Sequence, residues 1–363
     1  MIRKNKTVII FYLFLVLGFF CLTIFTTKNV SAQLALIGVT YGDFVPFEEY
    51  FQKDEELPKR ISFVGDVMLA RHVETLMSQH GSDYVFKKID SLNSKNNYLI
   101  GNFEGSIPKK HKKTPDFNLT FSVDDKYVSE LQAFGFTHLS LANNHSLDYK
   151  KSGYTNTVKV LSKNELQTFG HPTAVNSNSI TYVDVSGYKV AVIGLHTLFV
   201  EPNSEELVET FTEANQNSDI QIVYIHWGDE YRLEQNSTQR AFAKKLIALG
   251  TDLIVGHHPH VVQGIEKIDD VIVFYSLGNF VFDQYFSDAV RQGLVLDLEI
   301  KDSVKIKLKP IISHLASSQP QSMTKEEKQE FLRLLAKRSS SQLEEEILVG
   351  EVILPFDLQL LEK

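Results

Sequence analysis

The chain has 363 residues, 43% hydrophobic and 23% charged, an average composition that excludes collagen-like, coiled-coil and mostly disordered proteins. Its 45 acidic residues exceed its 37 basic ones, and the net charge of −8 argues against a nucleic-acid partner, because such proteins usually carry a basic surplus. A single cysteine excludes an intrachain disulfide framework and a thiolate metal cluster, which leaves the 12 histidines as the distinctive feature.

The first 28 residues predict a membrane segment. Thr7–Thr27 contains no charged side chain and is long enough to cross a bilayer as a helix. Arg3, Lys4 and Lys6 precede it, which predicts a cytoplasmic N-terminus and a domain on the extracytoplasmic side. Residues 30–32 (VSA) are typical of a cleavage site, so a cleaved signal that releases a secreted domain is the alternative to the membrane anchor that we favour.

The rest of the chain divides by its periodicity. Residues 29–58 are polar and acidic without a clear period, which is typical of a linker. From residue 59 to about 315, short apolar runs alternate with amphipathic segments, and this pattern predicts an α/β domain with a buried sheet. The expected strands are 61–66, 97–104, 137–144, 189–195, 220–227, 252–258 and 271–279, the expected helices include 125–135 and 237–250, and a hairpin is expected within 291–310. We expect residues 316–363 to form a C-terminal helical tail, with a helix from Thr324.

Polar residues stand at the ends of most of these strands, where ligands collect in open α/β sheets. They are Asp66, Asn102, Glu104, Asn143, Asn144, His145, His226, His257, His258, His260 and Asn279. Oxygen and imidazole donors without cysteine suit Zn, Mn, Fe or Co, and they exclude a structural cysteine-rich zinc site.

Taken singly, several of these residues have a structural alternative. A Gly-Asp pair such as that ending in Asp66 is common in turns, the Asn143-Asn144 pair can cap a helix, and His226 can be a core histidine. Three histidines within residues 257–260 are harder to explain without a metal, because imidazoles repel when charged and need partners when buried. His258 and His260 are therefore the strongest ligand candidates.

Six motifs, in this order, resemble the CapA family of capsule-synthesis proteins, the poly-γ-glutamate group whose fold is similar to that of calcineurin-like metallophosphoesterases. They are GDVML (65–69), NFEGSI (102–107), LANNHSLDY (141–149), HWGDEY (226–231), GHHPHVVQGIE (256–266) and SLGNFVFD (276–283). The resemblance covers about residues 61–283. It implies a four-layer α-β-β-α sandwich of the metallophosphoesterase type with a site for two divalent metal ions, such as Mn, Zn or Fe.

The resemblance also implies a role for each matching residue. The implied ligands are Asp66 and His260 for one ion, Asn144, His226 and His258 for the second, and Glu104 as a bridge between them. His145 would be the general acid, oriented by Asp148. Further candidates are Asn102, His257, Asn279, Asp283 and His72.

Two positions depart from the superfamily pattern. Met68 stands where a histidine is usual, and Glu104 is one methylene longer than the usual aspartate. The first ion would therefore lack one ligand unless His72 or Asp283 reaches it.

Two classes of function follow from this pattern. One is an external metal-dependent hydrolase that cuts a phosphoester or an amide. The other is a membrane-tethered scaffold or binding factor for an anionic capsule polymer. In both cases the resemblance implies, as partners, the capsule polymer or its precursor and membrane-bound capsule synthase subunits.

Overall fold

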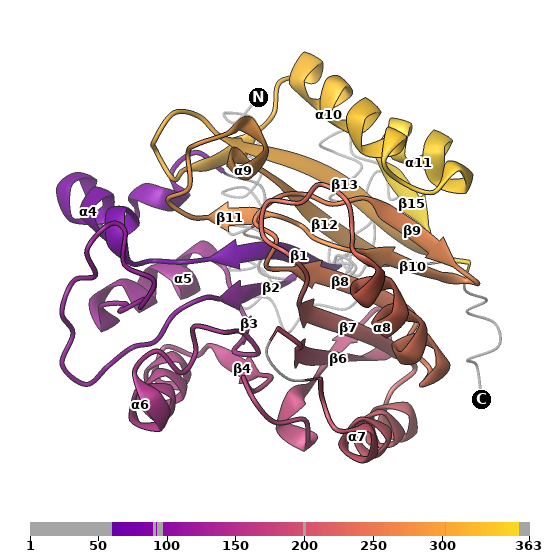
Figure 1. Ribbon diagram of the computed structural model, residues 1–363, viewed down its shortest axis with the longest axis horizontal. Helices are drawn as coiled ribbons and strands as arrows, with labels where there is room; N and C mark the ends of the chain where they lie inside the picture. Colours follow the sequence, from indigo (N-terminus) through magenta and orange to yellow (C-terminus); the bar gives the residue numbers. More distant parts are fainter. Residues whose placement is uncertain (1–59, 90–91, 93–96, 199–200, 302, 356–363) are drawn as a thin grey trace, which may run out of the picture. The chain divides into compact units, whose positions relative to one another are not determined.

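The computed structural model describes residues 60–89, 92, 97–198, 201–301 and 303–355 and arranges their strands in two sheets (Figure 1). The predicted anchor at 1–28 and linker at 29–58 lie outside these residues. Among the helices that are described, none combines the length and the apolar character needed to cross a bilayer.

The first sheet contains the strands β1 (Arg60–Val67), β2 (Asn97–Phe103), β3 (His138–Ser140), β4 (Gln167–Phe169), β11 (Asn279–Val281), β12 (Gln292–Ile300), β13 (Val304–Ser313), β14 (Pro320–Ser322) and β15 (Glu351–Ile353). Their order is β14-β13-β12-β1-β2-β3-β4, with β11 paired to β1 and β15 to β13. Strands β1 to β4 run parallel, so their carboxyl ends lie at one edge of the sheet.

The second sheet contains the strands β5 (Ile180–Val185), β6 (Tyr188–His196), β7 (Ile220–His226), β8 (Leu253–His257), β9 (Ile265–Ile268) and β10 (Val271–Phe274). Their order is β5-β6-β7-β8-β10-β9, and β6, β7, β8 and β10 are parallel. The central strands β7 and β8 are rich in β-branched residues and entirely buried, as expected for parallel strands covered on both faces.

The two sheets pack face to face around one apolar core. Phe63 of β1, Tyr224 of β7 and Leu296 of β12 belong to this core, and the rings of Phe63 and Tyr224 stack at 5.9 Å. The Tyr224 hydroxyl donates a hydrogen bond of 2.5 Å to the carbonyl of Val64, which satisfies a buried polar group across the two sheets. Each large apolar side chain buried here contributes about 1.5–3 kcal/mol to stability.

Helices cover the outer faces of both sheets. The α-helices of the described residues are α4 (Arg71–His80), α5 (Val128–Phe134), α6 (Lys150–Lys163), α7 (Ser204–Asn217), α8 (Ser237–Ala248), α9 (Asp288–Arg291), α10 (Lys325–Lys337) and α11 (Glu344–Val349). Apolar residues of α4, α5 and α6 pack on the first sheet, and those of α7 and α8 pack on the second. Buried residues of α10 and α11, such as Leu335 and Ile347, join the core between the sheets. The fold is thus a mixed α/β sandwich with two sheets, which confirms the predicted class.

Two predicted strands are wrong in extent, each for a local reason. The segment 271–279 is two strands in different sheets, β10 and β11, because the chain turns at Gly278, whose φ of +67° suits glycine. The strand expected at 137–144 is only β3, because Asn143 leaves the ladder and donates side-chain hydrogen bonds to Asn102 Oδ1 (2.9 Å) and the Phe103 carbonyl (2.8 Å).

The other predictions of secondary structure agree more closely. The hairpin is β12 and β13, and the helix expected at 237–250 is α8, which begins with a capping box of Asn236 and Gln239. The helix expected at 125–135 is a 3₁₀ turn (Asp125–Tyr127) followed by α5. Within 316–363, the chain forms α10 and α11 and also contributes β14 and β15 to the first sheet.

Candidate metal centre

The carboxyl ends of both sheets meet at one place, and this is where the predicted polar residues converge. A close approach between β1 and the segment 276–279 makes this possible: Gly65 lies so near that an added Cβ would be 1.8 Å from the Gly278 carbonyl oxygen. The Asp66 amide donates to that same oxygen over 3.1 Å. Because Gly65 has no Cβ, β1 can lie against the Gly278 carbonyl, and this contact sets the position of the Asp66 side chain.

Asp66 is the hub of the cluster and is fully buried. Its Oδ1 accepts a hydrogen bond of 2.8 Å from Asn102 Nδ2 and lies 3.4 Å from His257 Nδ1. Its Oδ2 accepts from the His258 amide (3.2 Å) and lies 3.3 Å from His260 Nδ1. Burial alone would raise the pKa of this carboxyl, but the contacts with His257 and His260 hold it below its usual range. Asp66 is thus an ionised carboxylate at neutral pH.

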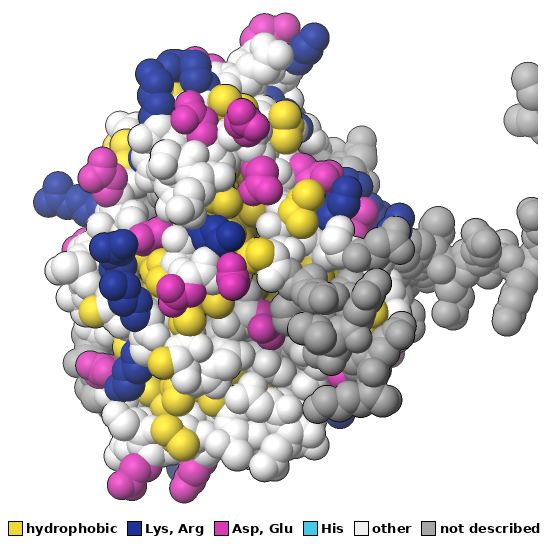
Figure 2. Space-filling view, turned by 90° about the vertical axis from the view of Figure 1, so that its right-hand side faces the viewer, with side chains coloured by type: hydrophobic (Ala, Val, Ile, Leu, Met, Phe, Trp, Pro, Cys, Tyr) yellow, Lys and Arg dark blue, Asp and Glu magenta, His cyan; other side chains and the backbone are white. Residues whose placement is uncertain are grey.

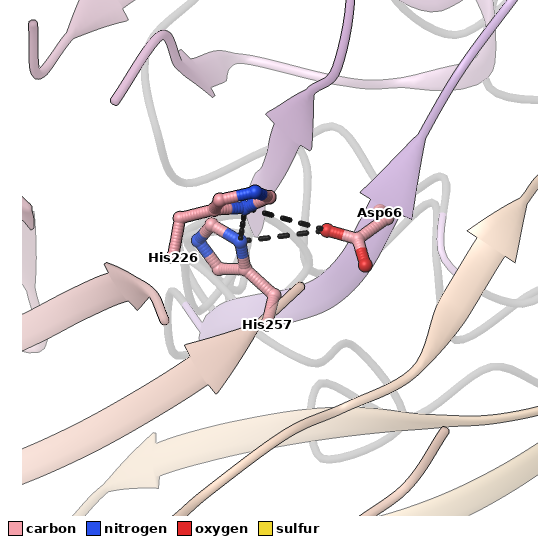
Figure 3. Close-up of side chains that lie close together, drawn as sticks. All are labelled: Asp66, His226 and His257. Atoms are coloured by element: carbon pink, nitrogen blue, oxygen red, sulfur yellow. Dashed lines mark hydrogen bonds and ion pairs between the residues drawn. The ribbon is translucent and has the colours of Figure 1, made fainter. Parts of the chain in front are cut away.

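His226 and His257 face Asp66 from the ends of neighbouring strands β7 and β8 (Figure 3). Their Nδ1 atoms are 2.8 Å apart, so one ring carries the shared hydrogen and the other accepts it. His226 Nε2 lies 2.8 Å from Asn144 Oδ1. Burial lowers the pKa of both imidazoles, most strongly that of His226, and keeps them in the neutral form that ligates metals.

His258 and His260 follow β8 in a strained loop, with φ angles of +99° and +56°. Such backbone strain in residues other than glycine concentrates at functional sites. Burial holds the pKa of His258 well below its usual value. For His260, the carboxylates of Glu104 and Asp66 outweigh burial and raise the pKa to about 9. Burial, together with the charge of Asp66, raises the pKa of Glu104.

The donor atoms of the cluster fit a metal ion. Three groups have donor atoms within 4.8 Å of one another: Asp66 with His226 and His257, Asp66 with Glu104 and His260, and Glu230 with His258 and His260. Three buried atoms in this cluster have no hydrogen-bond partner among the described residues, namely Glu104 Oε1, His257 Nε2 and His258 Nδ1. Native proteins rarely leave buried polar atoms unpaired, and nitrogen and oxygen donors of this kind suit divalent transition metals.

His145 lies beside the cluster and is held from two sides. Its Nδ1 is 3.0 Å from Asp148 Oδ2, and its ring stacks on Phe121 at 3.9 Å. Asp148 also accepts the Phe121 amide over 2.6 Å, so one carboxylate positions both rings. His145 Nε2 lies 3.7 Å from Glu104 Oε1 and therefore faces the cluster.

The structure does not bring every predicted residue into the cluster. The His72 ring lies against Tyr285 and 4.0 Å from Asp116, outside the groups that could hold an ion. Asp283 forms an ion pair with Arg71 instead. The Met68 side chain belongs to the apolar core.

The remaining candidates support the cluster from its edge. Asn279 Oδ1 lies 2.9 Å from His260 Nδ1, and Asn102 links Asp66 to Asn143. Sequence reasoning missed Glu230, although it lies in the HWGDEY motif four residues after His226.

The family model and two relatives that match this sequence are described as capsule or PGA synthesis proteins. Residues 60–284 match the family model "Bacterial capsule synthesis protein PGA_cap". The chain is 35% identical over 256 residues to the capsule biosynthesis protein CapA of Bacillus anthracis, which covers 65% of this chain and 62% of that protein, less than two thirds of its length. It is 32% identical over 296 residues to the PGA biosynthesis protein CapA of Bacillus subtilis (strain 168), which covers 77% of this chain and 78% of that protein.

A solved structure described as a novel phosphatase from Mycoplasma pneumoniae aligns with 70% of this chain and 87% of its own, at a TM-score of 0.40 and 14% identity. A similarity this distant supports no inference about activity.

Proposed function

Because the chain belongs to the PGA_cap family of bacterial capsule synthesis proteins, as its six motifs predict, we propose that it acts in the synthesis or export of a poly-γ-glutamate-type capsule and carries a metal-dependent hydrolase site. One observation carries the hydrolase part: the buried cluster at the strand ends contains three polar atoms without partners. Each such atom would cost about 1–3 kcal/mol if nothing bound it. Bound cations would remove this cost.

We assign two divalent ions, of Mn, Zn or Fe, to the cluster. Asp66, Glu104 and His260 would hold one of them, and the second would be held from the side of His226 and His257. Asn144, whose Oδ1 lies beside His226 Nε2, and His258, whose Nδ1 has no partner, are further ligands in this proposal. When bound, such ions supply a Lewis acid and a water of lowered pKa.

His145 would deliver the proton to the leaving group. Asp148 accepts the hydrogen on Nδ1, which orients the ring, while Nε2 faces the cluster as the donating atom. The stacked Phe121 ring limits rotation of the imidazole. General acid catalysis of this kind typically contributes about 10²–10⁴-fold to the rate.

The proposal also covers the membrane attachment and the location of the domain. A metallophosphoesterase-type sandwich would be anchored by residues 1–28 with its catalytic edge on the extracytoplasmic side, or secreted if that segment is cleaved. Its partners would be the capsule polymer or its precursor and membrane-bound synthase subunits. The charge pattern of residues 1–28 and the names of the relatives support this setting.

A second candidate is a scaffold that binds the polymer without cutting it. The relatives' names favour it, since they describe biosynthesis rather than hydrolysis. The two candidates differ in how binding and turnover depend on metal.

The test uses purified full-length protein and poly-γ-glutamate, with chain length followed by size-exclusion chromatography. If the protein is a hydrolase, chain shortening stops with EDTA, returns with Mn²⁺, and is about 10²–10⁴-fold slower in His145→Ala, which should keep its metal. A parallel assay with a nitrophenyl phosphodiester tells phosphoester from amide cleavage. Binding of poly-γ-glutamate by EDTA-treated protein, without cleavage of either probe after Mn²⁺ is restored, would reject the hydrolase and favour the scaffold.

A further inference from the structure

A buried arginine lies next to the metal centre and is not part of it. Arg71 is the first residue of α4 and only 7% exposed. Its guanidinium carbon is 4.6 Å from the centre of the Phe121 ring and 5.5 Å from that of Phe282. The two rings hold the cation by cation–π contacts, which are strongest when water is excluded.

Each of these rings in turn touches a histidine of the site. Phe121 stacks on His145 at 3.9 Å, and Phe282 lies 4.6 Å from His260. One aromatic ring therefore separates the Arg71 guanidinium from the proposed proton donor, and one separates it from a ligand of the cluster. The cation is fixed beside the place where substrate would react.

Arg71 also has unused bonding capacity. One terminal nitrogen pairs with Asp283, but Nε is buried without any hydrogen-bond partner. An unpaired N–H of a guanidinium is costly to bury, and its natural partner is an oxyanion. The backbone at Arg71 adopts a φ of +52°, a region that residues other than glycine rarely occupy and that marks functional positions.

The overall charge of the protein does not attract a polyanion. The net charge of the chain is −8, and Figure 2 shows acidic and basic side chains interspersed on one face of the domain. An anionic substrate is therefore better recognised by one buried cationic side chain, Arg71, than by the overall electrostatic potential of the protein.

We propose that Arg71 binds an oxyanion of the substrate beside the metal centre, either a free α-carboxylate of a γ-linked glutamate chain or a phosphate group. This inference rests on the proposed function, because it assigns the substrate class of the same site. Asp283 holds the guanidinium in place, and its Oδ2 accepts a hydrogen bond from the His72 amide (3.1 Å), which ties the carboxylate to the start of α4. Arg71 is thus a specificity residue rather than a metal ligand.

The test measures binding by calorimetry to the Mn²⁺-loaded full-length protein. Three probes are compared: a γ-linked glutamate pentamer, the same peptide with its carboxylates converted to carboxamides, and inorganic phosphate. The main variant is Arg71→Gln/Asp283→Asn, which removes both charges and avoids leaving one of them buried and unpaired. Arg71→Lys keeps the charge without the fork of donors. The matched control is Arg333→Gln/Glu330→Gln, which removes an exposed ion pair on α10.

The double variant should bind the glutamate pentamer about 10-fold to 100-fold more weakly than wild type, with Arg71→Lys between them and the control unchanged. Binding of the carboxamide peptide and the metal content should not change. A loss confined to phosphate would identify a phosphate group as the oxyanion.

Three outcomes would overturn the inference. They are unchanged affinity of the double variant for both oxyanions, an equal loss for the carboxamide peptide, and no oxyanion binding by the wild type. Metal content is measured on the same samples. Absence of metal from the wild type would defeat the proposed function, whereas metal-loaded protein whose oxyanion binding ignores Arg71 would defeat only this inference.

Discussion

Replacing Gly65 by alanine should weaken the fold and the metal centre together. The new Cβ would lie 1.8 Å from the Gly278 carbonyl oxygen and 2.9 Å from its carbon, and both atoms are backbone, so the segment 276–279 must move away from β1. That movement breaks the hydrogen bond from the Asp66 amide to Gly278 (3.1 Å) and displaces Asn279, which contacts His260. Both the lost hydrogen bond and the displaced Asn279 affect residues of the candidate metal centre, Asp66 and His260.

The magnitude follows from two contributions. Overpacking of a tight contact costs about 1–3 kcal/mol, and a buried hydrogen bond left unmade costs about 1–3 kcal/mol more. The free energy of unfolding should therefore fall by about 2–6 kcal/mol, which lowers Tm by about 3–10 °C at an unfolding entropy of about 2.1 cal/mol/K per residue.

The assay is urea and thermal unfolding followed by circular dichroism, with metal content measured on the same samples. Gly187→Ala is the matched control, because a Cβ there meets nothing within 4 Å and its φ of +92° limits the cost to backbone strain of about 1–2 kcal/mol. If Gly65→Ala is no less stable than Gly187→Ala and keeps its full metal content, the close approach does not position Asp66 and the reasoning fails.

Three further predictions address the site and the fold. His145→Ala should lower turnover by about 10²–10⁴-fold with metal content unchanged, and Asp148→Asn should lower it less; loss of metal in His145→Ala would contradict the assigned role. Because the folded-state pKa of His260 is raised to about 9, its contribution to stability is complete below pH 6.5 and is lost as the pH rises toward 9. In EDTA, urea unfolding should show a stability loss of about 1.4 kcal/mol per pH unit across that interval from this residue, and a profile that His260→Gln leaves unaltered would refute the assignment. Thr324→Ala removes the capping box of α10 and should cost about 1 kcal/mol by thermal unfolding, whereas Thr324→Ser should cost little; equal effects would rule out the cap.

Much of the architecture could be predicted because buried parallel strands are continuous apolar runs. The runs that became β1, β2, β6, β7 and β8 have this character, and they predicted an α/β domain with a buried sheet. The division into two sheets was implied only by the family resemblance. The short strands β14 and β15 were not predicted, because three residues carry no period and their pairing with β13 is a tertiary event. The split of 271–279 depends on the turn at Gly278, which an apolar run conceals.

The site was predictable to the extent that its residues stand at strand ends. Asp66, His226, His258 and His260 could be placed in this way, since parallel strands bring their carboxyl ends together. Arg71 could not, because the two rings that hold its guanidinium come from segments 50 and more than 200 residues away along the chain.

The sequence indicated His257 only as a further candidate, because its closest partner lies on another strand. As the last residue of β8, it has a neighbour directly opposite in the adjacent strand, and that neighbour is His226. Strand register, which a single sequence does not specify, brings the two rings together.

The most direct test of the account is the metal content of the full-length protein, purified in mild detergent without chelator and measured by mass spectrometry. We expect about two transition-metal ions per wild-type chain, and loss of metal in Asp66→Ala/His258→Ala. A wild-type protein that binds no metal at neutral pH, even after incubation with Mn²⁺ or Zn²⁺, would contradict the account.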